Sequence, residues 1–492
     1  MRLFKLLGKY FFRNPEIRRY LQINFRYPKA LSYIILYILA LLTLYTLIYF
    51  GMNIEFHYNK MEYGLYFKIL FKLTMFMEYV IFFYIGSYLI SNSIAHEKEK
   101  GTFDFIRLSV IDKKAIAFGK VLGAISFISF LLLITFPFVV VIALFLNMGL
   151  MNFLIVHFNL IIYAFLFHSI GLFCGIAFNK AQTANALALI IPVLITALAS
   201  VMEKSVLNPF VTLFESIEIS DFKSNTFNFY GTYISDFIIL GVIILYVSTW
   251  LIVASIRKLE SEENHLLTKK QTVYFTIGTE ILITGFFWDK LITGNLEFLA
   301  VFFLVNLVLL MGLTAILTPT KDDILIYFNK NLNFWQSIWY SKSPILPITI
   351  ILNLIVIAFG FFSTTMGVLF SSKASNSLLP IALSISILLF SLIYSQLYFL
   401  CNLVFLKNAP TITSVIIVLS FFIPIPLNFL TKSKDDILDL FILNPFITMS
   451  KMDKNIMTLA NITQFLLLVI ILLTLNIIIM TKKDQLTRKY KI

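Results

Sequence analysis

The chain has 492 residues, of which 59% are hydrophobic and only 13% are charged, and its mean hydropathy is +0.89. The charged share is about half that of an ordinary soluble domain, which argues against a soluble fold of this length. The net charge of +13 does not indicate a nucleic-acid-binding protein, because the basic residues lie between apolar blocks and not in one patch. The two cysteines, Cys174 and Cys401, give neither a disulfide framework nor the spacing of a zinc site.

Residues 1–27 predict an amphipathic helix that lies along the inner face of a membrane. Aromatic and aliphatic residues recur at helical spacing over residues 3–11, with basic residues between them. Pro15 is expected to interrupt this helix, which then resumes at Ile17. The alternative is a solvated basic tail. No cleavable signal is expected, because the basic stretch continues to Lys29 before the first long apolar block.

Apolar blocks of about 20 residues, the length that crosses a bilayer core, follow along the chain. They predict twelve transmembrane helices at 30–50, 70–91, 121–147, 153–177, 184–201, 233–255, 272–288, 297–317, 345–370, 378–404, 411–430 and 462–480. The seventh contains Glu280. The predicted fold class is therefore all-α, a polytopic transmembrane helical protein.

Basic residues in the connections predict the orientation, since cytoplasmic connections carry an excess of Lys and Arg. If the N-terminus is cytoplasmic, 28 of the 39 Lys and Arg residues lie on the cytoplasmic side. We therefore expect both termini to be cytoplasmic.

Two short matches predict that the halves of the chain are repeats. Leu207–Thr212 (LNPFVT) recurs as Leu443–Thr448 (LNPFIT). The spacing of Cys174, Phe178 and Lys180 also recurs at Cys401, Phe405 and Lys407. Six spans in each half give the repeats the same orientation, so the expected arrangement is a parallel duplication with domains 1–255 and 256–492. The Asn-Pro-Phe elements are expected to cap turns in the outer loops.

The most polar stretch of the first half, residues 92–120, lies between the second and third spans. Gly101 is expected to end the helix that leaves the membrane, and Thr102 to cap a new short helix with Asp104 near its positive end. Phe103, Ile106 and Leu108 then supply apolar contacts. A partly apolar helix at the cytoplasmic face is a natural docking element for another protein.

The pattern Glu-x-Glu-x-Gly-Thr, a short apolar helix, and Gly-Lys at the next span resembles the type-2 ABC transporter permeases. In that family this segment is the coupling helix, which enters a groove on a separate ATP-binding cassette ATPase, and ATP drives a substrate, usually outward. The resemblance assigns ATPase coupling to Glu97, Glu99, Gly101, Thr102, Phe103, Asp104, Ile106, Arg107, Gly119 and Lys120.

This sequence also departs from the family. Val110 stands where the family often has proline, and residues 318–344 of the second half contain Thr318–Asp323 in place of the motif. The resemblance is therefore specific for about residues 1–256 and architectural for the rest. The alternative interpretation is that 92–120 is an ordinary cytoplasmic loop.

No Gly-x-x-x-x-Gly-Lys-Ser/Thr motif occurs, so ATP is expected to bind a partner subunit and this chain to need no cofactor or metal of its own. We expect a transport permease and not an enzyme, since no acidic or histidine cluster at one membrane face points to chemistry on lipids or polysaccharides. Glu78, His157 and His168 lie inside predicted spans. They are candidates for a transport pathway, or, alternatively, for hydrogen bonds between packed helices.

The sequence thus predicts the permease subunit of an ATP-driven exporter in a prokaryotic cytoplasmic membrane. Its expected partners are an ATPase subunit and membrane lipid, without nucleic acid, and a homo-oligomer is left open. The alternative is an ion- or proton-coupled secondary transporter that uses Glu78, His157 and His168. The substrate is not defined by the sequence.

Overall fold

A computed structural model of the chain describes residues 14–55, 63–201, 208–210, 226–261, 265–292, 296–319, 333–370 and 391–401. It also describes Leu389 and scattered positions within 323–330 and 469–481. The chain divides into two compact units, Met1–Phe227 with Ile234–Asn264, and Asn228–Tyr233 with His265–Ile492. The expected relation between the halves as parallel repeats stays a prediction.

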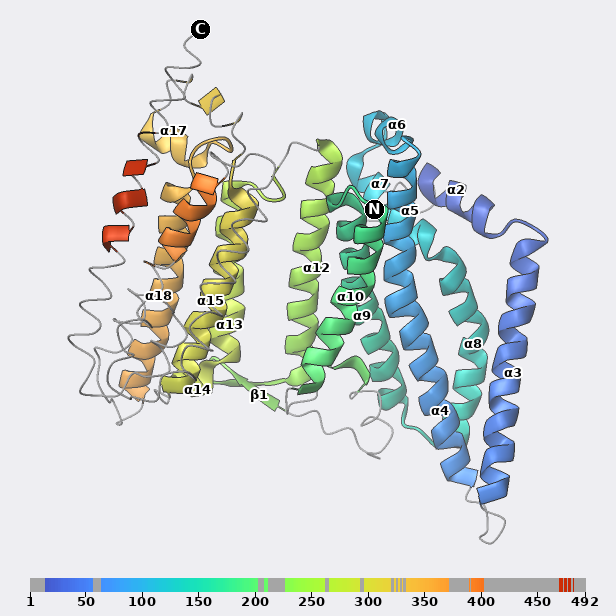
Figure 1. Cartoon of the computed structure of the whole chain (residues 1–492). Helices are drawn as coiled ribbons and strands as arrows, with labels where there is room; N and C mark the ends of the chain where they lie inside the picture. The colour runs from blue at the N-terminus through green and yellow to red at the C-terminus, as the bar shows by residue number, and fades with distance from the viewer. Residues whose placement is uncertain are drawn as a thin grey trace, which may run out of the picture. The chain divides into compact units, whose positions relative to one another are not determined.

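The first unit is built of helices (Figure 1). In chain order they are α2 (Pro15–Asn24), α3 (Lys29–Glu55), α4 (Tyr63–Val80), the π-turn η2 (Ile81–Ile85), α5 (Gly86–Glu99), α6 (Phe103–Leu108), α7 (Lys113–Ala124), α8 (Ser126–Phe145), α9 (Leu150–Ala177), α10 (Ala181–Val201) and α12 (Asp236–Glu260).

Five helical stretches among the described residues are long and apolar enough to cross a membrane. They are Lys29–Phe50, Gly64–Glu99, Ser126–Phe145, Leu150–Ala177 and Phe237–Glu260. These stretches indicate a membrane-embedded helical protein, while the total of twelve spans stays a prediction. The predicted third span was wrong at its start, because α7 ends at Ala124 and α8 begins at Ser126, so residues 121–124 belong to a separate helix.

Helix α9 forms the centre of the first unit and packs against α5, α10 and α12. Small residues allow the close approach to α5. A Cβ on Gly171 would lie 2.4 Å from the Ser87 carbonyl oxygen, and one on Gly175 would lie 3.1 Å from the Ser91 Cα. Such close contacts are the usual basis of helix packing in lipid. Lipid tails are as apolar as the side chains, so burial of apolar surface does not drive helices together there.

The second unit contains α13 (Lys269–Phe286), α14 (Trp288–Ile292), α15 (Leu296–Leu317), α17 (Phe334–Trp339) and α18 (Leu346–Phe370). Its apolar core includes Phe302, Phe303 and Leu352. Helices α13, α15 and α18 coincide within a few residues with the predicted spans 272–288, 297–317 and 345–370. Of the last three predicted spans, 378–404 is described mainly over Ser391–Cys401, while 411–430 and most of 462–480 lie outside the described residues.

A two-stranded hairpin precedes α12. Its strands are β1 (Thr226–Phe229) and β2 (Thr232–Ser235), and the turn residues Tyr230 and Gly231 have positive φ angles of 53° and 83°. Two consecutive positive φ values suit a tight hairpin turn. The predicted start of the sixth span at residue 233 was therefore wrong, because residues 233–235 are strand.

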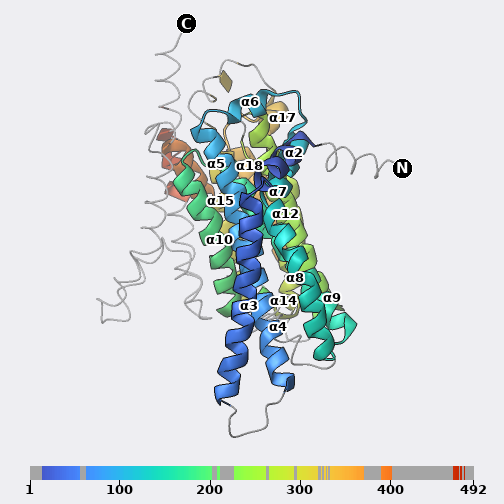
Figure 2. The same cartoon turned by 90° about the vertical axis from the view of Figure 1, so that its right-hand side faces the viewer.

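The two ends of the first unit give a direct test of the predicted orientation. Figures 1 and 2 show α2 and α6 at one end of the unit and the turn that joins α8 to α9 at the other. Cys174 and Cys401 are buried, so the native chain should give little background in thiol labelling. We expect a membrane-impermeant maleimide to label Val110→Cys only from the cytoplasmic side and Gly149→Cys only from the opposite side. Labelling from the reverse sides would contradict the orientation.

Candidate coupling site

The short helix α6 projects from the end of the first unit because the chain reverses sharply after α5. Gly101 has a φ of +68°, a left-handed conformation that favours glycine. Its amide donates to the Lys98 carbonyl at 3.0 Å, and the Thr102 amide donates to the Glu97 carbonyl at 3.0 Å. The predicted break at Gly101 is confirmed. Thr102 occupies the N-cap position as predicted, but its hydroxyl donates back to the Glu97 carbonyl at 3.3 Å and does not cap α6.

One side of α6 is anchored in the body of the unit. Phe103 is 4% exposed and packs in an apolar cluster with Ile90, Ile94 and Ile116. The Lys98 amine lies 5.5 Å from the centre of the Phe103 ring. It also donates to the carbonyls of Ile176 at 2.6 Å and Phe178 at 3.0 Å, at the end of α9. These bonds satisfy carbonyls that a helix end leaves without partners.

The connection from α6 to α7 is also fixed by hydrogen bonds. The Lys113 amine donates to the Arg107 carbonyl and, at 3.3 Å, to the Ser109 carbonyl. Asp112 caps α7 by accepting from the Lys114 amide at 3.0 Å. Asp104 and Arg107 form an ion pair of 3.1 Å across α6. The segment from Gly101 to Asp112 is therefore tied to both neighbouring helices.

The other side of α6 is apolar and exposed. Phe105 and Leu108 are 78% and 79% exposed, and Val110 just beyond the helix is fully exposed. Leu108, which was predicted with Phe103 and Ile106 to supply apolar contacts, leaves most of its side chain exposed, in contrast to the buried Phe103. Large apolar groups projecting from a polar loop are typical of a surface that another protein covers.

A buried ion cluster lies behind α6 and joins α2, α5 and α7. Lys120 is 1% exposed, and its amine contacts the Glu16 carboxylate at 3.2 Å and the Glu97 carboxylate more closely. Arg19 contacts Glu16 at 3.0 Å and also bonds to Glu97. The cluster holds two positive and two negative side chains, so its net charge is zero. Burial lowers the pKa of Arg19, but the hydrogen bond and charge of Glu97, with Glu16, outweigh this and raise that pKa above its usual value.

Two glycines on α7 make room for α2. A Cβ on Gly119 would lie 2.6 Å from the Glu16 Cβ, and one on Gly123 would lie 2.5 Å from the Tyr20 ring. The side-chain amide of Asn14 donates to the Ala115 carbonyl at 2.7 Å. Helix α2 is thus seated on protein along one face. The predicted helix is confirmed for the described part of residues 1–27, and residues 1–13 lie outside the described residues.

The predicted resumption of the helix beyond Pro15 is confirmed by α2, and the interruption of an earlier helix stays a prediction, because residues 1–13 lie outside the described residues. Pro15 is the first residue of α2, where its missing amide costs nothing, and Asn14 caps the helix by accepting from the Glu16 amide at 3.0 Å.

The residues predicted to couple to an ATPase therefore differ in their surroundings. The buried residues Glu97, Phe103, Gly119 and Lys120 form the support of α6, whereas Glu99 at the end of α5 and Asp104 on α6 are exposed. Gly101 and Thr102 form the reversal, and Ile106 and Arg107 are half-buried. Charge reversal at Glu97 would break the ion cluster, so of the two glutamates Glu99 is the one that reports on the surface itself.

Sequence reasoning missed Glu16, Arg19, Phe105 and Val110. One signal was available for Glu16, because it is the sole acidic residue among the first 27. A single carboxylate in a basic amphipathic segment indicates a specific buried partner, since the membrane surface would favour a basic residue there.

The second unit has a short helix in the corresponding stretch, between α15 and α18. In α17, Trp335 is 73% exposed.

The Lys269 amine at the start of α13 donates to the carbonyls of Ser343 at 3.1 Å and Pro344 at 3.3 Å, and burial lowers its pKa to about 7. Asp323 pairs with Lys342 at 2.9 Å, and Asp322 lies outside the described residues. Among the described residues at this end of the unit, the buried Lys269 amine is held by carbonyls, whereas Lys120 of the first unit is held by carboxylates.

The polar residues inside predicted spans are held by separate hydrogen bonds. Glu78 accepts from the Thr135 hydroxyl, and a His168 ring nitrogen lies 2.8 Å from the Phe82 carbonyl on η2. His157 bonds to the Phe153 carbonyl of its own helix at 2.9 Å. His168 therefore bridges two packed helices. In the second unit Glu280 accepts from Asn306 at 3.3 Å.

In the first Asn-Pro-Phe element, Pro209 and Phe210 are helical, and the expectation that the element caps a turn in an outer loop stays a prediction. The Asn208 side chain accepts from the Phe210 amide at 2.9 Å, and the Phe210 ring packs 5.1 Å from Phe76. The element's counterpart at 443–448 lies outside the described residues.

Comparisons of the chain with protein-family models, with curated proteins and with solved structures find no match. Among the described residues, no three or more His, Cys, Asp and Glu side chains gather as a metal ion would require. The resemblance to type-2 ABC permeases thus stands on the residues of the motif itself.

The ion cluster gives a stability prediction. Lys120→Met should leave Glu16 and Glu97 buried with Arg19 as their only counter-charge, and removal of one partner from a buried pair costs about 3–5 kcal/mol. We expect a clearly lower unfolding temperature in detergent and faster hydrogen exchange over residues 15–24. Lys100→Met, at an exposed position, is the matched control. Equal unfolding temperatures for the two variants would show that the cluster does not stabilise the fold.

Proposed function

We propose that this chain is the membrane-spanning permease subunit of an ATP-driven ABC exporter. A separate ATP-binding cassette ATPase docks on the outer side of α6, where it covers Phe105, Leu108 and Val110. The observation that carries the proposal is the two-sided character of α6, anchored on one side by Phe103 and apolar and exposed on the other.

The contacts of α6 suit it to transmit force. The segment is hydrogen-bonded to the ends of α5 and α7, α5 is bonded in turn to the end of α9 through Lys98, and the ion cluster joins α5 and α7 to α2 behind it. Displacement of α6 by a closing ATPase would therefore tilt several helices together. This supports a mechanical role in which ATP hydrolysis on the partner changes access to a substrate path.

The sequence pattern supports the finer parts of the proposal. The Glu97–Lys120 motif supports assignment to the type-2 family, and the excess of basic residues on one side supports a prokaryotic cytoplasmic membrane with both termini inside. Twelve spans in two parallel six-helix halves are part of the same proposal. The short helix α17, with its exposed Trp335, supports a comparable layout in the second half.

The test pairs two exposed substitutions with a matched control. Phe105→Ser with Leu108→Ser removes apolar groups from the proposed interface without touching the buried side of α6. Loss of interface hot spots typically costs 2 kcal/mol or more, which corresponds to about a thirtyfold weaker complex. Tyr27→Ser is the control, because Tyr27 is 77% exposed in the connection between α2 and α3.

The measurement is recovery of the ATPase with the tagged, detergent-purified permease, followed by ATP hydrolysis of the complex in liposomes. We expect the paired variant to lose both, and the control and the wild-type chain to keep both. If the wild-type chain recovers no ATP-binding cassette subunit, the exporter proposal fails and the secondary transporter becomes the leading alternative. If the paired variant retains full recovery, α6 is not the docking element.

A further inference from the structure

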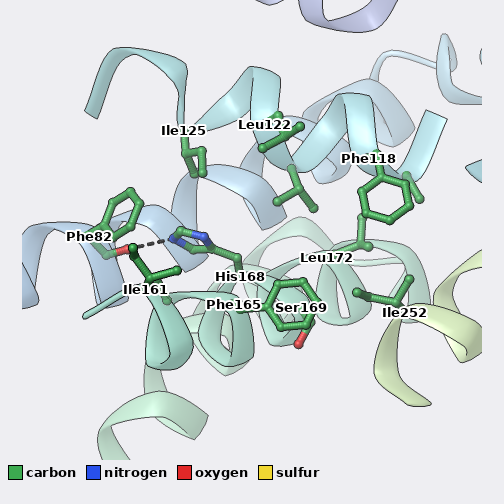
Figure 3. A pocket seen from close by; sticks show the side chains of 13 residues that line it. Phe82, Phe118, Leu122, Ile125, Ile161, Phe165, His168, Ser169, Leu172 and Ile252 are labelled. Carbon is green, nitrogen blue, oxygen red and sulfur yellow. Dashed lines mark hydrogen bonds between the residues drawn. The ribbon is translucent and has the colours of Figure 1, made fainter. Parts of the chain in front are cut away.

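A cavity of about 300 Å³ lies inside the first unit, among η2, α7, α9 and α12 (Figure 3). Its walls include Phe82, Phe118, Leu122, Phe165, Leu172 and Ile252. Figure 3 shows these side chains converging on one space from several helices. A group that fits this space would gain dispersion contacts with the side chains that line it.

The lining determines the chemistry of that occupant. The two polar side chains on the wall are held by backbone bonds, since the His168 ring bonds to the Phe82 carbonyl and the Ser169 hydroxyl donates to the Leu166 carbonyl at 2.7 Å. The remaining lining side chains are apolar. Such a wall offers water few partners, and it suits a hydrocarbon chain.

The position of the cavity within the helices points to a lipid. The α9 wall runs through the middle of Leu150–Ala177, a stretch long and apolar enough to cross a membrane, and Ile161 on this wall is 61% exposed. A hydrocarbon chain could thus enter at membrane depth.

A positive charge lies where the lipid head group would be. On α7 the lining residues Phe118, Val121, Leu122 and Ile125 follow helical spacing along one face, and Lys114, one turn before Phe118, continues that face. Lys114 is exposed. The last turn of α12, which packs against α7, adds Arg257 and Lys258. Basic groups at the cytoplasmic ends of helices attract anionic lipid head groups.

We infer that the cavity holds one acyl chain of an anionic phospholipid of the inner leaflet, with the phosphate near Lys114. This site is separate from the docking surface on α6 and does not depend on whether an ATPase binds there. The face of α7 toward the cavity carries Phe118 and Leu122, while Gly119, Lys120 and Gly123 contact α2 and the ion cluster. A bound chain would fill the space between α7 and α9.

The experiment uses the full chain in nanodiscs with photoactivatable phospholipids. The probes are phosphatidylglycerol and phosphatidylcholine, each with a diazirine midway along one acyl chain, and labelled peptides are identified by mass spectrometry. Ala164→Phe fills the cavity, because Ala164 lies on its wall and is 3% exposed. Ala40→Phe adds the same side chain on an exposed face of α3 and is the control. Lys114→Glu tests the head-group position without touching the core, with exposed Lys100→Glu as its control.

We expect phosphatidylglycerol to label peptides 118–125 and 161–172 several times more than phosphatidylcholine does. Ala164→Phe should remove this labelling, and Lys114→Glu should reduce the preference for phosphatidylglycerol. If Ala164→Phe does not accumulate as folded protein, the Lys114→Glu comparison decides. Even labelling of all exposed helices, equal labelling by the two lipids, or a preference unchanged in Lys114→Glu would overturn the inference.

Discussion

The arrangement of helices beside α6 in the first unit depends on one buried amine. Lys120 is almost fully enclosed, and a lone charge in such a place would be strongly destabilising. Glu16 and Glu97 compensate it from two other elements, and Arg19 balances the second carboxylate. The requirement for neutrality therefore fixes the positions of α2, α5 and α7 relative to one another. Gly119 and Gly123 have no side chains, so α2 can approach α7 closely enough for these charges to meet.

This support explains how a helix of six residues keeps a defined position. Isolated helices of that length are unstable in water, so α6 owes its structure to its neighbours. The reversal at Gly101, the buried Phe103 ring and the bonds of Lys98 and Lys113 hold its inner side. The outer side is left with Phe105 and Leu108 in solvent, and this combination of fixed backbone and exposed apolar groups underlies the proposed docking of an ATPase.

Sequence patterns predicted the elements that depend on local composition. Long apolar blocks gave most helices of the described chain, and the glycine after a polar helix end gave the break at residue 101. The faces of α6 were not predictable, because six residues show no usable periodicity that would separate the buried Phe103 from the exposed Leu108. The helix beyond Pro15 was predicted from its spacing, and the cap at Asn14 fixes its first residue.

The ion cluster and the cavity were beyond sequence reasoning for a different physical reason. Glu16, Glu97 and Lys120 are far apart in the chain, and only packing brings them together. Glu97 was therefore read as a surface charge with Glu99, although the two differ sharply in exposure. A cavity is a place that side chains fail to fill, and no pattern of residues along the chain reports such a space.

The central claim is that the exposed side of α6 meets an ATP-binding cassette subunit. The most direct measurement places a photoreactive benzoylphenylalanine at Phe105 in the full chain, irradiates living cells, and identifies the cross-linked partner by mass spectrometry. The same group at exposed Tyr27 is the comparison position. We expect a cross-link to an ATP-binding cassette ATPase from position 105 and none from position 27. Cross-linking of position 105 to lipid alone, or to no ATPase, would contradict it.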